Sequence, residues 1–431
     1  MAELSCDIVV GLGFGDEGKG RTTEMFARSN PTKSVVKFSG AQQTAHNVKF
    51  GKFHHTYRQF GSATHREIPT VLSRFMLVDP LYLFKEGDVL YEKTGWNPFP
   101  DLLISENSLM ITPIHIWMNR AREIARGQKR HGSCGLGVGE TRKYALYYAE
   151  GEEPKMGDLT TSRIKGLRNK LVKLKAYAES EMGETYPETV DSLMETYEAV
   201  VSEGALHIVE DWVITEHLST GYHVFEGTQG VLLDETLGFL PHNTWTSTVP
   251  KNALLLLEEA GRSGKVTGIM RSYGTRHGAG PFPSELLPNL GLDWIPDQST
   301  LEKELPELHN GTGKFTGVWR RGLLDLALLE YSVRAAEQVD QIMMTHLDLV
   351  KPDWKVVTGY DGWRNIPSDY YGNDNRAKEE HTAHLANLSL KDAHITELNA
   401  NNLVSFVSDF LNVPVNFGSI SLEAETEVRL S

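Results

Sequence analysis

The sequence is poor in cysteine, in basic residues relative to acidic ones, and in long hydrophobic runs. Its 431 residues include two cysteines, Cys6 and Cys134, which excludes a disulfide framework or a zinc site built on several thiolates. Lysine and arginine number 43 against 57 aspartate and glutamate residues, a net charge of −14. Nucleic acid is therefore not an expected partner, because phosphate-backbone binding uses clustered basic surface.

Features of a membrane or exported protein are also missing. The longest apolar runs, such as Ala253–Leu257, fall far short of the ~20 residues that span a bilayer. The opening residues, MAELSCDIVVGLG, have neither a basic segment nor a long apolar one. We expect a cytoplasmic protein without membrane association. Its 40% hydrophobic and 23% charged residues are typical of a globular chain.

Short apolar strands alternate with helical patterns along the chain, which predicts an α/β fold with a large, mostly parallel central sheet and flanking helices. Residues 151–222 are rich in Lys, Glu and Leu at helical spacing and predict a helical insertion. The expected strands are Asp7–Gly11, Ser34–Phe38, Leu102–Ser105, His223–Phe225, Val266–Arg271 and Gln341–Thr345. The expected helices are Gly18–Arg28, Ile114–Arg126, Arg163–Ala178, Thr189–Val201, Asn252–Glu259 and Leu323–Gln338.

The strongest motif, GLGFGDEGKG at residues 11–20, directly follows the first expected strand. Gly13 to Lys19 satisfies G-x-x-x-x-G-K, the frame of a phosphate-binding loop whose amides and following helix N-terminus favour an anion. Gly20 stands where an ordinary P-loop has a Ser or Thr for Mg²⁺. Asp16 and Glu17 would repel a polyphosphate, unless one of them binds the metal or acts as a base. The alternative interpretation is a Gly-rich turn that binds nothing.

The segment GFGDEGKG resembles the signature of adenylosuccinate synthetases, ligases that join aspartate to carbon 6 of IMP with GTP. The resemblance continues in order through most of the chain. Among its blocks are GAQQTAHN (40–47), HGSCGLGVG (131–139), EGTQGVLLD (226–234), PHNTWTST (241–248), YGTRHGAGPFPSEL (273–286), FTGVWRRGLLDL (315–326), THLD (345–348) and VPVNFGS (413–419). It implies the P-loop-like fold of that family, as a single domain over residues 1–431.

The resemblance also implies a two-step reaction and the residues that perform it. Asp16 is the implied general base on N1 of a 6-oxopurine and, with Ala45, the implied ligand of a Mg²⁺ cofactor. Lys19 holds phosphates, and His46 stabilises charge on the leaving nucleoside diphosphate. Gln229 contacts the 6-oxygen of the purine.

Further positions resemble the binding residues of the family. Those implied for nucleotide binding are Gly15, Glu17, Gly18, Gly20, Gln43, Cys134, Thr244, Asp348 and Gly418, together with Arg142 as the candidate arginine lent by a partner subunit. Those implied for the amino acid are Thr316, Val318 and Arg320, of which arginine suits a carboxylate because its planar fork binds both oxygens. The implied partners are a purine nucleotide, L-aspartate, GTP or ATP, and a second copy of the chain in a homodimer.

Several positions depart from the pattern of the family. Val318 replaces an arginine shared by the amino-acid carboxylate and the ribose 2′-hydroxyl, and His346 and Ser421 replace basic residues around the donor base. Gln43 replaces an asparagine, Cys134 a threonine and Leu136 an arginine. The expected recognition of substrate is therefore altered, while Asp16, Lys19, His46 and Gln229 are kept.

Three hypotheses follow. The first is a ligase that forms an N6-succinyl purine nucleotide, adenylosuccinate or an analogue. The second is a variant resembling phage-type enzymes, which would make 2-amino-2′-deoxyadenylosuccinate from dGMP with ATP or dATP. The third is a nucleotide-binding paralogue without ligase turnover, against which the retention of Asp16 and His46 argues, because a pure binder needs neither a base nor a charge-stabilising histidine.

Overall fold

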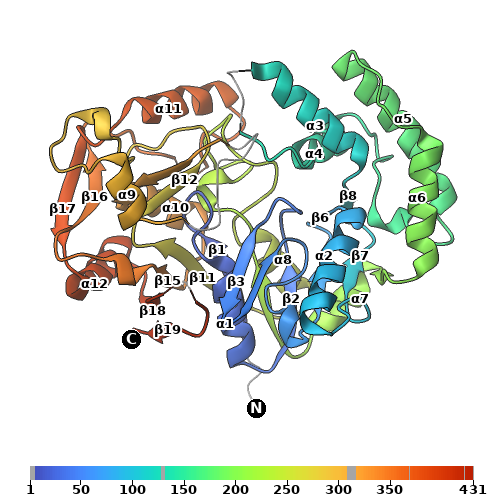
Figure 1. The fold of residues 1–431 in the computed structure, drawn as a ribbon, viewed down its shortest axis with the longest axis horizontal. Helices are drawn as coiled ribbons and strands as arrows, with labels where there is room; N and C mark the ends of the chain where they lie inside the picture. Colours follow the sequence, from blue (N-terminus) through green and yellow to red (C-terminus); the bar gives the residue numbers. More distant parts are fainter. Residues whose placement is uncertain (1–4, 128–131, 308–316, 368, 422, 431) are drawn as a thin grey trace. The chain divides into compact units, whose positions relative to one another are not determined.

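A computed structural model describes residues 5–127, 132–307, 317–367, 369–421 and 423–430. Its contacts divide the chain into two compact units that interleave along the sequence. The first unit comprises Met1–Ile8, Thr23–Gly227 and Lys251–Gly264, and the second comprises Val9–Thr22, Thr228–Pro250 and Lys265–Ser431. The units share strand β1 (Cys6–Gly11) and helix α1 (Lys19–Ser29), both labelled in Figure 1.

Five strands of the first unit form a parallel arrangement. Their order is β10 (Tyr222–Glu226), β2 (Thr32–Lys37), β5 (Thr70–Leu72), β7 (Leu103–Ser105) and β9 (Ile208–Val209). All four neighbouring pairs are parallel. Val35, Val36, Val224 and Phe225 are fully buried, as expected for strands covered on both faces. Hairpin β3 (His46–Phe50) and β4 (Phe53–Tyr57) is antiparallel and short.

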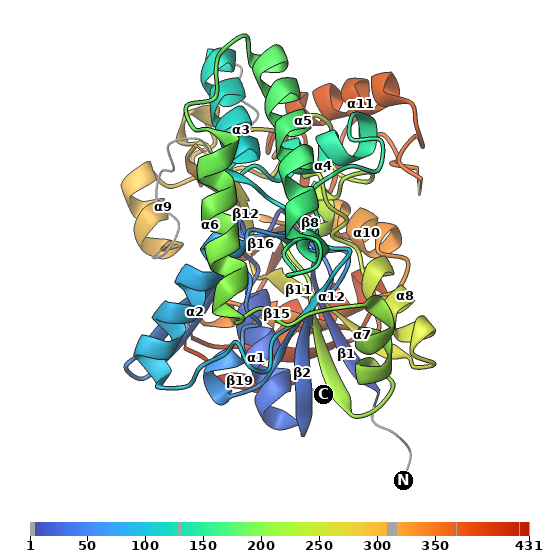
Figure 2. The same cartoon turned by 90° about the vertical axis from the view of Figure 1, so that its right-hand side faces the viewer.

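Two helices of the first unit begin at clear sequence signals. Asp79 caps α2 by accepting from two backbone amides, and Thr112 with His115 forms a capping box at α3. In both views α5 lies beside α6 (Figures 1 and 2). The helices are α2 (Pro80–Thr94), α3 (Pro113–Arg126), α4 (Val138–Tyr147), α5 (Ile164–Met182), α6 (Val190–Glu203), α7 (Asp211–Leu218) and α8 (Lys251–Glu259).

The second unit carries the strands that end at the phosphate loop. Parallel strands β11 (Gly264–Arg271), β15 (Gln341–Thr345) and β18 (Val415–Ser419) are followed by an antiparallel edge strand, β19 (Glu427–Arg429). Outside this set are the hairpin of β12 (Gly274–His277) and β13 (Trp319–Gly322), and the sheet β14 (Leu324–Asp325), β16 (Trp354–Tyr360) and β17 (Ala393–Leu398). The helices are α9 (Gln298–Glu304), α10 (Leu326–Ala335), α11 (Asn375–Asn387) and α12 (Ala400–Leu411).

The core of the second unit lies against helices α10 and α12. Leu326 and Leu329 of α10 and Leu403 of α12 pack with Met344 of β15 in one buried cluster. Phe14 of the phosphate loop belongs to the same cluster, at ring-centroid distances of 6.1 Å from Phe239 and 6.0 Å from Phe282. The apolar side of the loop is thereby fixed on the core.

The expected α/β class, with a mostly parallel sheet and flanking helices, is confirmed. Several expected boundaries differ from the observed ones by a few residues. The helix predicted at Leu323–Gln338, for example, starts at Leu326, because Leu324–Asp325 pair with β16 and Asp325 caps the helix through the amide of Leu328. Helices α5, α6 and α7 lie within the predicted insertion, together with the short strand β9. The single-domain assignment stays a prediction.

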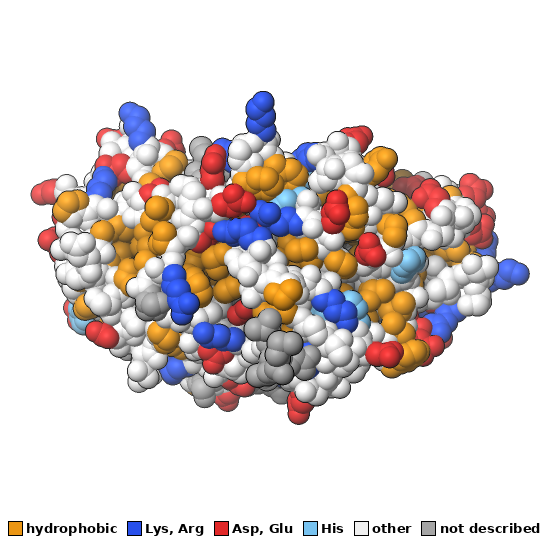
Figure 3. All heavy atoms as spheres, turned by 90° about the horizontal axis from the view of Figure 1, so that it is seen from below, with side chains coloured by type: hydrophobic (Ala, Val, Ile, Leu, Met, Phe, Trp, Pro, Cys, Tyr) orange, Lys and Arg blue, Asp and Glu red, His pale blue; other side chains and the backbone are white. Residues whose placement is uncertain are grey.

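The face of the molecule shown in Figure 3 carries both basic and acidic side chains. On the face shown in Figure 3, the described basic side chains lie among acidic and hydrophobic ones and form no continuous basic field. Among the described helices, none combines the length and the apolar character needed to cross a membrane.

Candidate functional site

The loop between β1 and α1 closes around a carboxylate of its own. The amides of Gly13 and Gly15 donate to Glu17 Oε1 at 3.0 and 2.7 Å, and Lys19 Nζ donates to Oε2 at 2.7 Å. Gly15 has a φ of 94°, which favours glycine. Converging backbone amides and a lysine at a helix N-terminus form an anion-binding nest. A phosphate that uses these same donors must displace Glu17.

Asp16 lies in the same loop with its side chain half-buried. Its φ is 63°, and its backbone oxygen accepts from Arg271 Nε at 2.7 Å. Burial raises the pKa of its carboxyl, while the charges of Arg271 and Lys19 oppose that rise. Within the described ranges no hydrogen bond reaches the carboxylate, so Asp16 is anchored through its backbone with its side chain available for a proton or a metal.

Arg271 is a residue of this site that sequence reasoning missed. It ends β11, is buried, and donates through Nη1 to the hydroxyl of Tyr273 at 2.6 Å. Its guanidinium carbon lies 5.3 Å from the ring centroid of Trp319 and it pairs with Glu307 at 3.7 Å. Ligands of α/β sheets bind beyond the carboxyl ends of the strands. The position of Arg271 at the end of a predicted strand was therefore a signal in the sequence that it belongs to the site.

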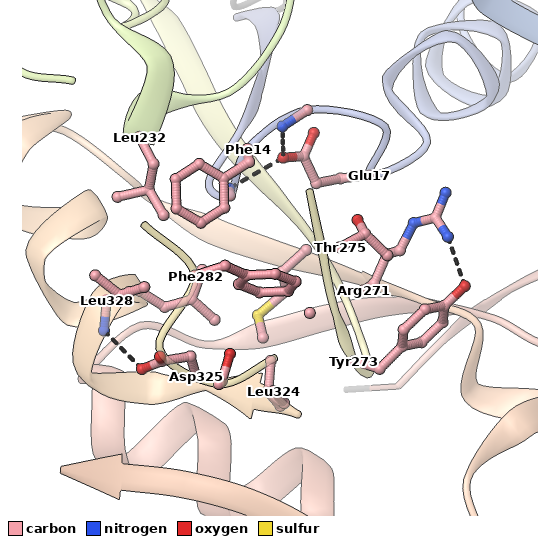
Figure 4. Close-up of a pocket in the computed structure, with 16 residues that line it drawn as sticks. Phe14, Glu17, Leu232, Arg271, Tyr273, Thr275, Phe282, Leu324, Asp325 and Leu328 are labelled. Atoms are coloured by element: carbon pink, nitrogen blue, oxygen red, sulfur yellow. Dashed lines mark hydrogen bonds between the residues drawn. The ribbon is translucent and has the colours of Figure 1, made fainter. Parts of the chain in front are cut away.

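A cavity of about 50 Å³ lies beside the loop in the second unit. Phe14, Phe282 and Leu328 give it apolar walls, with Glu17 and Arg271 at its rim (Figure 4). Asp325 also lines it and accepts from the Tyr360 hydroxyl at 2.5 Å; burial raises the pKa of this carboxyl to about 6. Because the lining is mostly apolar, the cavity supports the phosphate loop and offers few polar groups that could recognise a ligand.

Gln229 follows β10 and lies against the phosphate loop within the second unit. Its φ is 51°, and its side-chain oxygen is buried without a hydrogen-bond partner in the described structure. The amide of Leu232 donates to the carbonyl of Gly13 at 3.2 Å. A buried polar atom normally has a partner, so the free Oε1 of Gln229 is consistent with a ligand at this position.

His46 heads β3 in the first unit and is held by a buried carboxylate. Its Nδ1 lies 2.5 Å from Glu226 Oε1, and the amide of Ser62 donates to Glu226 Oε2 at 3.1 Å. The Ser62 hydroxyl also donates to Glu226. A carboxylate on Nδ1 fixes the orientation of the imidazole ring.

A buried lysine completes this network. Lys37 ends β2, is fully buried, and places Nζ 3.4 Å from Glu226 Oε2. Burial alone raises the pKa of Glu226, but Lys37, His46 and Ser62 outweigh it and lower that pKa to about 2. Glu226 is therefore an ionised positioning residue for His46.

Gln43 lies in the loop before β3, and Cys134 lies in the loop before α4; both are predicted to bind nucleotide. Both side-chain amide atoms of Gln43 are buried without a hydrogen-bond partner in the part of the chain that is described. Arg58 Nη1 donates to the carbonyls of Gln42 and Thr44 at 3.0 and 3.3 Å and so holds the loop. Cys134 is half-buried, and burial raises the pKa of its thiol. Gln43 has the unsatisfied donor and acceptor that a ligand would complete.

The predicted donor-base residues gather near the ends of β15 and β18. The His346 amide donates to Ser419 Oγ at 3.3 Å, and its Nδ1 lies 3.0 Å from Thr345 Oγ1. Burial first, then the charges of Arg271 and Arg21, lower the pKa of His346 well below its usual value. Asp348 is exposed, and Gly418 is buried, with space for no side chain beside Leu347. A neutral imidazole thus stands where the family pattern has a lysine.

Residues predicted to bind the amino acid differ in how they are placed. Arg320 donates through Nε and Nη2 to Glu285, at 2.9 and 2.5 Å, and through Nη1 to two backbone carbonyls. Val318 is 58% exposed, and Thr316 lies outside the described residues. The Thr244 amide donates to the carbonyl of Leu233 at 2.7 Å, which fixes the loop of the implied phosphate contact.

The donor set at Asp16 fits a magnesium ion. Mg²⁺ prefers oxygen ligands and is usually held by one or two carboxylates plus substrate phosphates, and Asp16 offers a carboxylate without a hydrogen-bond partner in the described structure. No group of three potential Asp, Glu, His or Cys ligands occurs over the described ranges. A metal here would therefore depend on phosphate oxygens, with the carbonyl of Ala45 as the second implied protein ligand.

Comparison with known proteins decides the family. The family model described as adenylosuccinate synthetase matches residues 8–428. The chain belongs to the adenylosuccinate synthetase family. An adenylosuccinate synthetase of Thermoplasma volcanium is 29% identical over 79% of this chain and 75% of its own length. The Vibrio parahaemolyticus adenylosuccinate synthetase is 30% identical over 82% and 80%.

Solved structures show that this chain has the adenylosuccinate synthetase fold. A fully ligated adenylosuccinate synthetase from Plasmodium falciparum covers 99% of this chain and all of its own, at a TM-score of 0.80 and 17% identity. A cyanophage S-2L succinoaminodeoxyadenylate synthetase, bound to dGMP and dATP, covers 99% and 95% at a TM-score of 0.59 and 14% identity. The predicted family and fold are confirmed, and the protein is a nucleotide-binding ligase of the adenylosuccinate synthetase type.

The family assignment leaves the individual roles of the predicted residues as predictions. Within the second unit, the structure brings Asp16, Glu17, Lys19 and Gln229 together around one loop. Within the first unit it places His46 on Glu226 and Gln43 near the start of the same hairpin. Arg142 lies on α4, half-buried, in the first unit.

Proposed function

We propose that the protein condenses L-aspartate with a 6-oxopurine nucleotide at carbon 6, using a nucleoside triphosphate, to give an N6-succinyl purine nucleotide. The observation that carries this proposal is the phosphate loop. Its amides and Lys19 already close on an anion, and the Asp16 carboxylate beside them has no partner in the described structure. An anion nest that carries its own base suits phosphoryl transfer to an acceptor that must first lose a proton.

The proposed chemistry has two steps. Asp16 removes the N1 proton of the purine, and the 6-oxygen attacks the γ-phosphorus and releases the nucleoside diphosphate. The amine of aspartate then attacks carbon 6, loses a proton, and displaces the 6-oxygen as inorganic phosphate. Lys19 and the loop amides hold the phosphates once Glu17 leaves them, and Gln229 contacts the 6-oxygen.

His46 stabilises charge in the proposed transfer. Glu226 orients His46 through Nδ1, so that Nε2 donates to the leaving diphosphate. Magnesium, when bound by Asp16 and the Ala45 carbonyl, neutralises phosphate charge. The other nucleotide contacts proposed are the loop glycines, Gln43, Cys134, Thr244, Asp348 and Gly418.

A second candidate reaction is the synthesis of 2-amino-2′-deoxyadenylosuccinate from dGMP with ATP or dATP. Two observations favour it. The exposed Val318 offers no donor to a ribose 2′-hydroxyl, and the neutral His346 differs from the lysine of the guanine-binding pattern. The cyanophage structure of the same fold is titled as bound to dGMP and dATP. A nucleotide-binding paralogue without turnover is the remaining alternative.

A homodimer is also proposed. Arg142 lies on α4, whose end carries the exposed apolar side chains of Leu146, Tyr147 and Tyr148. Exposed apolar surface of this kind is typical of an interface, and association of two copies would let Arg142 reach a partner's nucleotide.

The testing experiment measures phosphate release by the purified protein with aspartate and Mg²⁺, with products identified by mass. IMP, dIMP, GMP and dGMP are crossed with GTP, ATP and dATP. Turnover with IMP and GTP supports the first reaction, and turnover confined to dGMP with an adenine donor supports the second. Nucleotide binding without phosphate release in every combination contradicts both and supports the paralogue.

A further inference from the structure

Two buried ring nitrogens on the hairpin of β12 and β13 lack hydrogen-bond partners in the described structure. They are Nε2 of His277 and Nε1 of Trp319. The two residues are Cα partners across the hairpin, and their rings meet edge to face with centroids 5.8 Å apart. A buried polar group that lacks a hydrogen-bond partner destabilises the folded protein. Two such groups side by side therefore indicate that a ligand completes them.

The two rings lie on the face of the hairpin that borders the proposed base. Side chains alternate between faces along a strand, so Trp319 and His277 share one face, whereas Arg320 and its partner Arg276 share the other. The guanidinium of Arg271 lies 5.3 Å from the ring centroid of Trp319 and donates to the backbone of Asp16. The ring nitrogens of His277 and Trp319 thus lie on the face of the hairpin that borders Asp16, the proposed base.

Of the positions first implied for the amino acid, the two described ones, Val318 and Arg320, offer few free donors. Four of the five guanidinium N–H groups of Arg320 are used within the chain, two by Glu285 and two by the carbonyls of Gly278 and Gly280. Val318 has an aliphatic side chain and offers none. The carboxylates of an amino acid must therefore find other donors at this site.

We propose that His277 and Trp319 bind one carboxylate of the amino-acid substrate; this rests on the proposed function. An indole N–H only donates, so its partner carries an acceptor oxygen. Imidazole Nε2 donates when it carries the proton. Residues directly opposite in an antiparallel pair have Cα atoms about 4.5–5.5 Å apart. The two donors are therefore close enough together to bind the two oxygens of one carboxylate.

The test is steady-state kinetics with aspartate varied at saturating nucleotides. Trp319→Phe deletes the N–H and keeps the ring, and we expect KM for aspartate to rise roughly tenfold or more, as for a lost hydrogen bond to a charged group. KM for both nucleotides should stay within about twofold, since neither binds this N–H. His277→Leu should act like Trp319→Phe, and His277→Gln, which keeps an N–H donor, should restore much of the loss.

Trp354→Phe is the matched control. Its indole donates to the carbonyl of Ser272 at 2.8 Å, so its loss should lower the melting temperature without raising KM for aspartate. Trp319→Phe removes a donor with no described partner and should leave the melting temperature unchanged. An unchanged KM for aspartate in Trp319→Phe, or a rise in KM for the purine nucleotide instead, overturns the proposal.

Direct binding separates this inference from the proposed reaction. Aspartate is titrated by calorimetry into the nucleotide-loaded wild type and into Trp319→Phe. Weaker binding in the variant supports the carboxylate site even if the wild type ligates nothing, in which case only the proposed reaction fails. Equal binding in the two proteins overturns the carboxylate site whatever the turnover.

Discussion

Replacing Glu226 by glutamine probes the network that holds His46. Glu226 is fully buried, lies 2.5 Å from His46 Nδ1 and 3.4 Å from Lys37 Nζ, and accepts from Ser62. Glutamine keeps the shape but loses the charge and brings an N–H₂ group to donors that need an acceptor. Lys37 would then be buried without the carboxylate that it pairs with.

The magnitude follows from the pKa of Glu226, which is lowered from 4.5 to about 2. That difference corresponds to about 3 kcal/mol of stability. The contribution is fully present above pH 4.5 and is lost as pH falls through about 2. Breaking a buried ion pair by removing one partner costs about 3–5 kcal/mol, in agreement.

The assay is urea denaturation at pH 7 followed by circular dichroism, together with phosphate-release kinetics. Glu226→Gln should lower the free energy of unfolding by about 3 kcal/mol. It should also lower kcat, with a smaller effect on KM, because His46 loses its orientation. The double variant Lys37→Met/Glu226→Gln removes the stranded charge and should recover stability but not kcat. A single variant as stable as the wild type would refute the reasoning about this buried network.

Three further predictions concern the second unit. Asp16→Asn should abolish phosphate release while nucleotide affinity, measured by calorimetry, stays within about threefold, because the base is lost but the nest is kept. Glu17→Gln removes the internal anion from Lys19, so inorganic phosphate should bind more tightly in a competition titration; weaker binding would contradict the displacement of Glu17 by phosphate. Burial raises the pKa of Asp325 from 3.8 to about 6, so the wild type should lose about 3 kcal/mol of stability as pH rises between those values. Asp325→Asn should remove this loss of stability. Parallel curves of stability against pH for the variant and the wild type would contradict the prediction.

The phosphate loop could be predicted from sequence because its signals are local. A β-branched strand, closely spaced glycines and a lysine fix strand, turn and helix N-terminus within a short stretch. Sequence reasoning missed that Glu17 occupies the nest, since a side chain folding back on Gly13 and Gly15 depends on which anion is present.

Long-range partners could not be predicted. Glu226 lies 180 positions from His46, and Arg271 lies 255 positions from Asp16; no spacing rule joins them. Arg320 is predicted to bind a substrate carboxylate on account of its planar fork, and that assignment stays a prediction; its contact with Glu285 could not be predicted from sequence. The pattern identifies a residue type suited to carboxylates, but only tertiary packing decides which carboxylate it meets.

The central claim is that the 6-oxygen of the purine is phosphorylated and leaves as phosphate. It is tested by supplying the acceptor nucleotide labelled with ¹⁸O at position 6, with aspartate and the active donor, and analysing the inorganic phosphate by mass spectrometry. The account predicts one ¹⁸O atom in each phosphate released during formation of the N6-succinyl product. Unlabelled phosphate, with the label retained in the nucleotide or found in water, would contradict it.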